Sequence, residues 1–373
     1  MEKKIKVIIS GGGSGGHLFP AIAIAKALQK LVLDIEILFV GAKGKIEMEL
    51  VPKNGFNIEG LWISGLQRKK LYKNLLFPFK LISSLLKARK IIKKFKPDIV
   101  IGTGGFASGP LINVATMMKI PALIQEQNSF PGITNRLLAP KVQIICVAYD
   151  NMDKYFPSSK IRFTGNPVRK EITELNINKD EALKHFGLDN DKKTVLVIGG
   201  SLGAKTINES IMLSLELFDK NNLQLIWQTG KYYYDTAAAA IKTLQNKGCK
   251  TQIYVSAFIN EMDYAYAASD LIVSRAGAIA ISELCIVGKP IILVPSPNVA
   301  EDHQTKNALK LYTMNAAMMI KDQEAKNKLG AKIITLLNNK PKIEELTSNI
   351  KKLAKKKAAD KIADEALKLI LQN

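Results

Sequence analysis

The chain contains two copies of the segment that opens a parallel-sheet domain. Residues 6–25 read KVIISGGGSGGHLFPAIAIA and residues 194–211 read TVLVIGGSLGAKTINESI. In each copy a short apolar run is followed by glycines and then by a helical pattern. A hydrophobic strand, a glycine-rich turn and a helix begin a doubly wound α/β domain. Because the copies lie about half a chain apart, they predict two such domains rather than one large sheet.

Short apolar runs alternate with helical patterns along the 373 residues. Continuous apolar strands separated by helices indicate parallel sheets that are covered on both faces. The predicted strands are 6–10, 35–40, 99–101, 122–125, 144–148, 194–198, 224–228, 252–255, 271–274 and 291–294. Beyond Lys321 the pattern is helical only.

The linker between the two domains is expected within FTGNPVRKEI at 163–172, before the polar stretch 176–193. We therefore predict an α/β protein with two Rossmann-like, doubly wound domains, 1–165 and 166–373, that face one another across a cleft. The last helix of the second domain could pack back on the first.

Composition narrows the class of protein. No apolar stretch is long enough to span a bilayer, and the first apolar run breaks into glycine before it resembles a secretory signal. Three scattered cysteines, without metal or disulfide spacing, suit a reducing cytoplasm. The net charge of +21 favours an anionic partner: nucleic acid, a membrane surface or a phosphorylated ligand.

The first glycine loop fits the G-x-G-x-x-G spacing of a dinucleotide site through Gly11, Gly13 and Gly16. A dinucleotide enzyme also needs an acid at the end of the second strand, but that strand ends at Val40 without one. A nicotinamide cofactor is therefore disfavoured, while backbone amides at a helix N-terminus still suit a phosphate. His17 follows the loop, where an imidazole can accept a proton near neutral pH.

Further polar loops follow other predicted strands. GTGGFASGP at 102–110 is a second phosphate-type loop, and ALIQEQN at 122–128 brings Glu126 and Asn128 to the same sheet edge. Glu126 could act as a base, bind a ligand or only hold its loop together. In the second half, SRAGAIAISE at 274–283 offers amides to a diphosphate. A polar loop with His303 and Gln304 follows the next strand.

These segments, taken in order, resemble the motifs of the MurG family of UDP-GlcNAc-dependent N-acetylglucosaminyltransferases. The resemblance covers essentially the whole chain, through GGGSGGHLFPAIAIA, GTGGFASGP, QEQNSFPGITNRLLA, GNPVR, GGSLGAKTIN, SRAGAIAISE and DHQTKNA. It implies a GT-B fold and inversion at the anomeric carbon. It also implies transfer of GlcNAc from UDP-GlcNAc to the 4-hydroxyl of undecaprenyl-pyrophosphoryl-MurNAc-pentapeptide. This step converts lipid I to lipid II in peptidoglycan synthesis, at the cytoplasmic face of the membrane.

The resemblance also implies roles for residues. The implied donor-binding set is Ser14, Gly15, Gly16, Asn128, Arg169, Ser201, Phe258, Ile259, Ala278, Ile279, Ala280, Glu283, His303 and Gln304. The implied acceptor-pyrophosphate set is Gly13, Ser14, Gly15, Gly16, Gly104 and Gly105, with His17, Glu126 and Asn128 around the reacting hydroxyl.

Our hypothesis is that His17 is the general base, and Glu126 is the alternative. Leu202 and Ala280 depart from the family pattern, where glutamine and threonine are common, so polar side-chain roles are not expected there.

No metal ion or other cofactor is expected. The sequence has no D-x-D motif at a strand end, since DND at 189–191 precedes its strand. A helix N-terminus, backbone amides and Arg169 can instead stabilise the departing UDP.

The segment from Arg68 to Lys96 holds eleven Lys or Arg and no acid. It also has more apolar residues than the single buried face of a surface helix requires. Lysines beside exposed apolar groups are typical of a peripheral anchor on anionic lipid. The residues predicted to meet the membrane are Lys73, Leu75, Leu76, Phe77, Phe79 and Lys80.

The expected partners are thus UDP-GlcNAc, lipid I and an anionic membrane surface, with other cell-wall synthesis proteins as further candidates. A nucleic-acid partner is not expected, because no motif of that kind is present. The main rival is a UDP-GlcNAc epimerase, which shares the two-domain architecture but needs neither a membrane patch nor two glycine loops and a histidine in its first half. A further alternative is a non-catalytic sugar-lipid carrier, which would require an inactive acceptor site.

Overall fold

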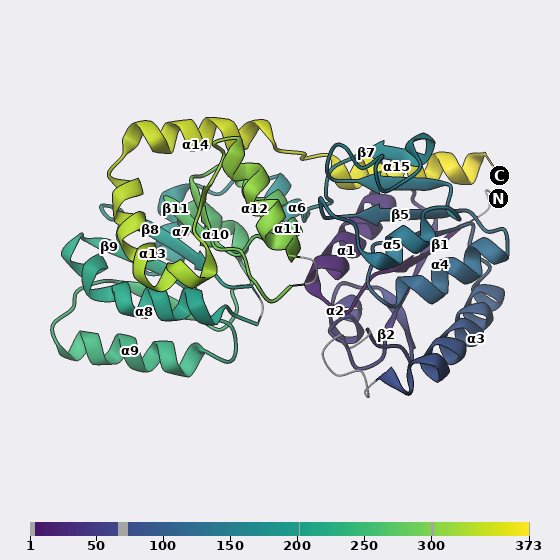
Figure 1. Cartoon of the computed structure of the whole chain (residues 1–373), viewed down its shortest axis with the longest axis horizontal. Helices are drawn as coiled ribbons and strands as arrows, with labels where there is room; N and C mark the ends of the chain where they lie inside the picture. The colour runs from purple at the N-terminus through teal and green to yellow at the C-terminus, as the bar shows by residue number, and fades with distance from the viewer. Residues whose placement is uncertain (1–3, 66–73, 201, 300–301, 373) are drawn as a thin grey trace. The chain divides into compact units, whose positions relative to one another are not determined.

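A computed structural model describes residues 4–65, 74–200, 202–299 and 302–372 (Figure 1). The chain divides into two compact units. Unit 1 comprises Met1–Arg169 together with Lys355–Asn373, and unit 2 comprises Lys170–Ala354. The boundary at 169/170 falls inside the segment 163–172, and the C-terminal helix belongs to unit 1.

Unit 1 is built on a seven-stranded parallel sheet of order β3-β2-β1-β4-β5-β6-β7. The strands are β1 (Ile5–Ser10), β2 (Ile35–Ala42), β3 (Asn57–Leu61), β4 (Ile99–Gly102), β5 (Ala122–Glu126), β6 (Ile144–Val147) and β7 (Ile161–Phe163). The central strands β1, β4, β5 and β6 are almost wholly buried, which explains their continuous apolar sequences.

Helices cover both faces of this sheet, as two separate apolar clusters show. One cluster joins the sheet to α3 (Phe77–Phe95), α4 (Ser108–Met117) and α5 (Ile133–Leu138). The other joins it to α1 (Gly15–Leu31) and α15 (Ala358–Leu371). The short helix α2 (Glu47–Lys53) connects β2 to β3.

Unit 2 repeats the plan with a six-stranded parallel sheet of order β10-β9-β8-β11-β12-β13. The strands are β8 (Lys193–Ile198), β9 (Leu223–Gln228), β10 (Ile253–Ser256), β11 (Leu271–Ser274), β12 (Ile291–Leu293) and β13 (Met318–Met319). The helices are α6 (Lys170–Thr173), α7 (Lys179–His185), α8 (Lys205–Lys220), α9 (Tyr234–Asn246), α10 (Met262–Ala268), α11 (Ala278–Val287), α12 (His303–Thr313), α13 (Asp322–Leu337) and α14 (Lys340–Lys352).

The predicted α/β fold with two doubly wound parallel sheets is confirmed, and each of the ten predicted strands is present to within two residues. Three short strands were not predicted. They are β3, β7 and β13, and each lies at the edge of a sheet.

The strand order reverses once in each sheet. In unit 1 the order reverses at β1, which pairs with β2 on one side and β4 on the other. In unit 2 it reverses at β8, which pairs with β9 and β11. Open α/β sheets bind ligands beyond the carboxyl ends of the strands at such a switch point. Both predicted glycine loops of unit 1, after β1 and β4, are at this place.

Candidate functional site

The two glycine loops of unit 1 touch one another. A Cβ atom on Gly105 would lie 2.3 Å from the carbonyl oxygen of Gly12, and one on Gly104 would lie 2.9 Å from Nδ1 of His17. Both Gly104 and Gly105 have positive φ, at 93° and 83°. Only glycine combines this backbone conformation with so close an approach. The predicted pyrophosphate loops and His17 are therefore brought together.

The N-terminus of α1 faces this junction without a capping side chain. Ser14 is the N-cap residue and makes no side-chain hydrogen bond to the helix, and the first turn holds no acid. The carbonyl of Ser14 accepts from the amides of His17 and Leu18. The backbone amides of Gly15 and Gly16 lie before the first hydrogen bond within the helix. These amides and the positive end of the helix dipole are therefore suited to binding an anion.

A buried carboxylate that sequence reasoning missed supports the first loop. Glu47 is fully buried, and the amide of Gly13 donates to both of its oxygens, at 3.1 and 3.0 Å. The amide of Ala42 also donates to Glu47, at 3.0 Å. A Cβ atom on Gly12 would lie 2.2 Å from the same carboxylate. Glu47 thus ties the loop to the end of β2 and fixes its path.

His17 points its Nδ1 atom at two oxygens. Nδ1 lies 3.0 Å from the carbonyl oxygen of Thr103 and 3.2 Å from Oε1 of Gln127. The carbonyl of His17 accepts from the hydroxyl of Thr103 at 2.7 Å. Backbone and ring are therefore both anchored to the loop after β4.

Glu126 holds its own loop together. The backbone amide and the side-chain amide of Asn128 donate to one carboxylate oxygen, at 3.0 and 3.1 Å. The amide of Gly132 and the side chain of Asn135 donate to the other, at 3.1 and 2.9 Å. Glu126 is also buried. This geometry favours the loop-holding role over that of a proton acceptor, and it links Glu126 directly to Asn128.

Arg169 is the last residue of the first segment of unit 1. Its guanidinium carbon lies 5.5 Å from the ring centre of Phe19, which suits a cation–π contact. A Cβ atom on Gly15 would lie 3.0 Å from the same ring. Within unit 1, Arg169 is thus placed near the N-terminus of α1.

The glycine loop of unit 2 also packs tightly. Gly203 has φ of 81°, and a Cβ atom there would lie 2.1 Å from the carbonyl oxygen of Thr229. Leu202 is largely exposed, in line with the absence of a polar role. Ser201, a member of the implied donor-binding set, lies outside the described residues.

The predicted diphosphate turn of unit 2 is the first turn of α11. Gly277 is the N-cap residue, without a side-chain cap, and its carbonyl accepts from the amide of Ile281. The amides of Ala278, Ile279 and Ala280 lie before this first helical bond, where they suit an anion. One turn later Glu283 is buried and accepts from the hydroxyl of Tyr266 at 3.1 Å.

Phe258 and Ile259, two members of the implied donor-binding set, are held by a residue that was not predicted. Gln228, at the end of β9, accepts from the amide of Ile259 at 3.0 Å and donates to the carbonyl of Gly200 at 3.2 Å. It therefore joins the Phe258–Ile259 segment to the glycine loop. Its signal in the sequence is its position at a strand end, directly before Thr229-Gly230.

Gln304 performs a similar task at the start of α12. Its side-chain oxygen accepts from the amides of Ala276 and Ser296, at 3.2 and 2.9 Å. It thereby holds together the loops after β11 and β12. His303 begins the helix beside it.

The predicted membrane residues divide into two groups. Leu75, Leu76 and Phe79 are exposed, by 77%, 56% and 65%. Phe77 instead is half-buried and packs against the core of unit 1. Lys80 donates to the hydroxyl of Ser64 and lies 5.9 Å from the ring of Trp62. Lys73 lies outside the described residues. Over the described part of the chain, no helix has the length and apolar character that a membrane span needs.

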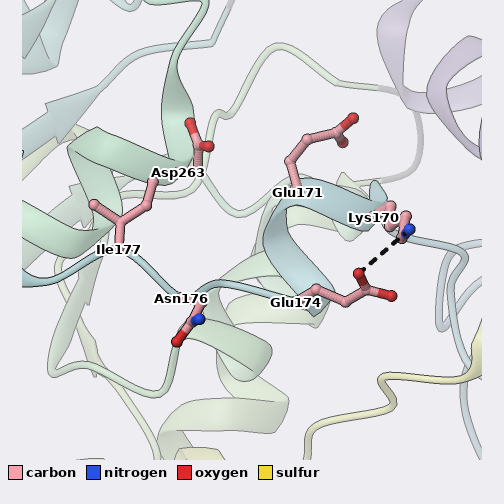
Figure 2. Close-up of a pocket in the computed structure, with 6 residues that line it drawn as sticks. All are labelled: Lys170, Glu171, Glu174, Asn176, Ile177 and Asp263. Atoms are coloured by element: carbon pink, nitrogen blue, oxygen red, sulfur yellow. Dashed lines mark ion pairs between the residues drawn. The ribbon is translucent and has the colours of Figure 1, made fainter.

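A pocket in unit 2 is lined by residues of a different kind. Figure 2 shows three carboxylates around it, from Glu171, Glu174 and Asp263, with Lys170 paired to Glu174 at 3.4 Å. No glycine-loop residue is among those that line it. Its mainly acidic lining does not suit a nucleotide diphosphate.

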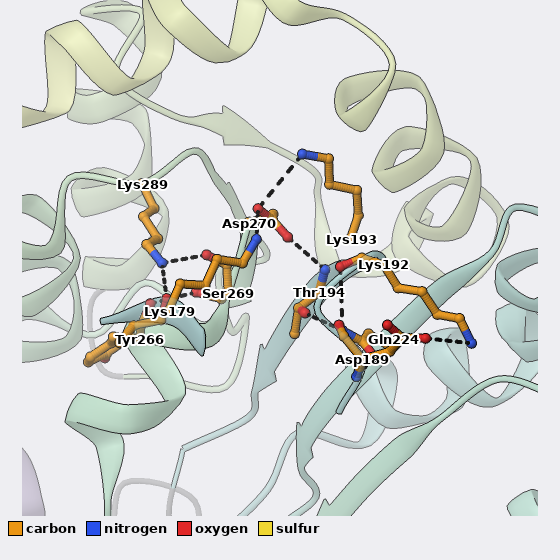
Figure 3. A network of polar contacts seen from close by, with 11 residues as sticks. Lys179, Asp189, Lys192, Lys193, Thr194, Gln224, Tyr266, Ser269, Asp270 and Lys289 are labelled. Carbon is orange, nitrogen blue, oxygen red and sulfur yellow. Dashed lines mark hydrogen bonds and ion pairs between the residues drawn. The ribbon is translucent and has the colours of Figure 1, made fainter. Parts of the chain in front are cut away.

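A polar network at the amino ends of β8 and β11 is structural (Figure 3). Asp270 accepts from the amide of Thr194 at 2.8 Å and pairs with Lys179 at 2.6 Å. Nearby, Lys289 donates to the carbonyls of Ala267 and Ser269. Burial lowers the pKa of Lys289 to about 8. The network lies at the sheet edge opposite the glycine loops, away from the site.

Comparison with known proteins gives a consistent result. The glycosyltransferase family 28 N-terminal domain matches residues 7–147 and the C-terminal domain of that family matches residues 194–362. A Parabacteroides distasonis protein is 51% identical over 368 residues, 99% of either chain. A Bacteroides thetaiotaomicron protein is 52% identical over 370 residues, again 99% of either chain. Both carry the name UDP-N-acetylglucosamine–N-acetylmuramyl-(pentapeptide) pyrophosphoryl-undecaprenol N-acetylglucosamine transferase.

Solved structures agree on the fold. Acinetobacter baumannii MurG is 27% identical and superposes with a TM-score of 0.76, over 98% of this chain and 100% of that one. A Neisseria meningitidis UDP-GlcNAc 2-epimerase reaches 0.68 over all of both chains, but at 15% identity it shows the shared fold alone.

Proposed function

Because this chain belongs to glycosyltransferase family 28, we propose that it transfers GlcNAc from UDP-GlcNAc to undecaprenyl-pyrophosphoryl-MurNAc-pentapeptide, which makes lipid II from lipid I. The observation that carries the assignment is identity of about half, over the full chain, to enzymes named for this transfer. The epimerase alternative is not favoured, since its likeness extends to the fold only.

The proposed reaction is one displacement at the anomeric carbon of GlcNAc. The acceptor 4-oxygen forms a bond to that carbon while the bond to the UDP oxygen breaks, and UDP leaves with the electron pair. His17 receives the hydroxyl proton. The two glycine loops and the uncapped N-terminus of α1 support a pyrophosphate beside it. Attack from the face opposite the leaving group inverts the configuration.

The donor is proposed to bind in unit 2. The first amides of α11 would hold the diphosphate, Glu283 the ribose, and the backbone of Phe258–Ile259 the uracil. The sugar would lie near His303 and Gln304. Helix amides and Arg169 can stabilise the leaving UDP, so we propose that no metal is required. Transfer that persists in excess EDTA would support this proposal, and loss restored by Mg²⁺ would contradict it.

The lipid-borne acceptor also requires access to a membrane. Leu75, Leu76 and Phe79 are exposed apolar groups on a segment rich in lysine, which suits peripheral attachment to anionic lipid. We propose that this surface meets the cytoplasmic face of the membrane and that other cell-wall synthesis proteins could assemble beside it.

The decisive experiment follows radiolabel from UDP-GlcNAc to a lipid I analogue. We expect label in the lipid with the natural chain and a loss of at least about a hundredfold in kcat with His17→Ala. His185→Ala is the matched control, because His185 is an exposed residue of α7 outside the site. Absence of transfer by the natural chain refutes the proposed function, whereas near-normal turnover by His17→Ala refutes the role of His17.

A further inference from the structure

Behind His17, three buried side-chain amides form a continuous hydrogen-bonded chain. Gln127 donates to the side-chain oxygen of Gln125, and Gln125 donates to Oδ1 of Asn166 at 2.9 Å. Asn166 donates in turn to the backbone carbonyl of Gln127 at 3.0 Å. The three residues are 1%, 0% and 3% exposed. Buried amides that are fully engaged in this way are held rigidly.

The backbone carbonyls at both ends determine which way each amide points, because a carbonyl oxygen can only accept. Asn166 must direct its NH₂ group at the carbonyl of Gln127, which leaves its oxygen for the NH₂ group of Gln125. The oxygen of Gln125 then accepts from Gln127, whose NH₂ group also donates to the carbonyl of Thr103 at 2.6 Å. The chain therefore presents the oxygen of Gln127, not its nitrogen, to the imidazole.

This orientation has a consequence for the imidazole of His17. Its Nδ1 atom faces two acceptors, the oxygen of Gln127 at 3.2 Å and the carbonyl of Thr103 at 3.0 Å. A neutral ring satisfies both only if its single proton is on Nδ1. The lone pair is then on Nε2. In water an unconstrained neutral histidine prefers the opposite tautomer, so the protein must impose this one.

We propose that Gln127, oriented by Gln125 and Asn166, is a positioning residue that sets the Nδ1–H tautomer of His17 and leaves Nε2 as the proton acceptor. The use made of Nε2 rests on the proposed function, whereas the tautomer itself does not. Asn166 lies three residues before the end of the first segment of unit 1. The Asn166 end of the amide chain is therefore close in sequence to the point where the polypeptide passes into unit 2.

The tautomer can be observed directly by NMR. The chain has three histidines, so the ring nitrogens of His17 can be assigned in ¹⁵N-histidine-labelled protein by comparison with His17→Ala. We expect the neutral ring, in the full chain without substrate, to carry its proton on Nδ1 and to leave Nε2 bare. A neutral ring with its proton on Nε2 would overturn the proposal.

Two substitutions separate positioning from a structural role. Gln127→Leu removes one of the two acceptors that face Nδ1 and leaves only the carbonyl of Thr103, so we expect mixed tautomers and a kcat lower by about tenfold, with the KM for UDP-GlcNAc unchanged. Gln127→Glu keeps an oxygen toward Nδ1 but replaces the NH₂ group that donates to Thr103 and Gln125, so we expect it to keep the tautomer and part of kcat at a lower stability than the natural chain. If Gln127 only supported the fold, a buried carboxyl would be the more damaging replacement.

Gln224→Leu is the matched control. Gln224 is a fully buried glutamine of unit 2, bonded to Asp189 and Thr194 (Figure 3), and its loss should lower stability without altering the His17 spectrum. Gln127→Leu with an unchanged spectrum and kcat would overturn the proposal. If the protein gives the expected spectrum but transfers no label, the proposed function is contradicted. The proposed tautomer of His17 is then still supported.

Discussion

Replacing Gly105 with alanine tests whether contact between the two glycine loops matters for the acceptor site. Gly105 has φ of 83°, and its new Cβ would lie 2.3 Å from the carbonyl oxygen of Gly12. Gly55 provides a matched control in the same unit. Its φ is 82°, but a Cβ there meets nothing within 4 Å. The two variants share the backbone strain, and only one adds the collision.

The expected magnitudes follow from these geometries. A left-handed backbone costs an alanine roughly 1–2 kcal/mol, so Gly55→Ala should lower the free energy of unfolding by that amount. Gly105→Ala should lose a further 1–3 kcal/mol or so through overpacking. Since real Cβ contacts are essentially never below 3.0 Å, the loops must separate by about 0.7 Å. A displacement of this size near the reacting groups should reduce kcat/KM for the acceptor roughly 10- to 100-fold.

Chemical denaturation and initial-rate assays with varied acceptor measure both effects. We expect Gly55→Ala to keep natural kinetics and Gly105→Ala to lose acceptor affinity, with the KM for UDP-GlcNAc unchanged. The reasoning fails if the two variants have equal stability and equal acceptor kinetics, because loop contact would then contribute nothing.

Three further predictions concern other parts of the chain. Gln228→Leu should raise the KM for UDP-GlcNAc at least about fivefold in initial-rate assays, because the amide of Ile259 loses its hydrogen-bond partner. A change in the KM for the lipid substrate instead would contradict this. Phe79→Ser should weaken binding to anionic vesicles at an unchanged melting temperature, whereas Phe77→Ser should lower that temperature; natural vesicle affinity in Phe79→Ser would argue against a membrane role. Burial lowers the pKa of Lys289 to about 8, so between pH 8 and the ordinary 10.5 the unfolded chain binds more protons than the folded chain. Stability should therefore rise with pH through this window, by up to about 3 kcal/mol, and a Lys289→Met variant that kept the full rise in denaturation curves would refute the assignment.

The sequence was most informative where one physical requirement dominates. Strands buried on both faces must be continuously apolar, and most of the predicted strands are of this kind, although β10 (Ile253–Ser256) is a half-buried edge strand. The strands β3, β7 and β13, which were not predicted, also lie at sheet edges and run for five, three and two residues. No strong pattern is needed there.

The site was predicted in the same uneven way. The glycine loops were recognisable because tight turns at strand ends need glycine. Glu47 was not, because EMELVPK reads as a charged surface helix and only the fold turns its first residue inward. The sequence around Phe77 likewise could not separate its packed ring from the exposed ring of Phe79, two residues on.

The C-terminal helix α15 affects how the chain is made. Its residues Ile362, Ala366 and Leu369 belong to the same apolar cluster as Leu18 and Leu28 of α1, so the core of unit 1 joins two helices that flank unit 2 in the sequence. During synthesis, unit 2 is complete and able to fold first, although it is encoded second. The face of α1 that receives α15 stays uncovered until residues 358–371 have left the ribosome. A chaperone that binds the nascent chain would therefore encounter an incomplete unit 1 together with a complete unit 2.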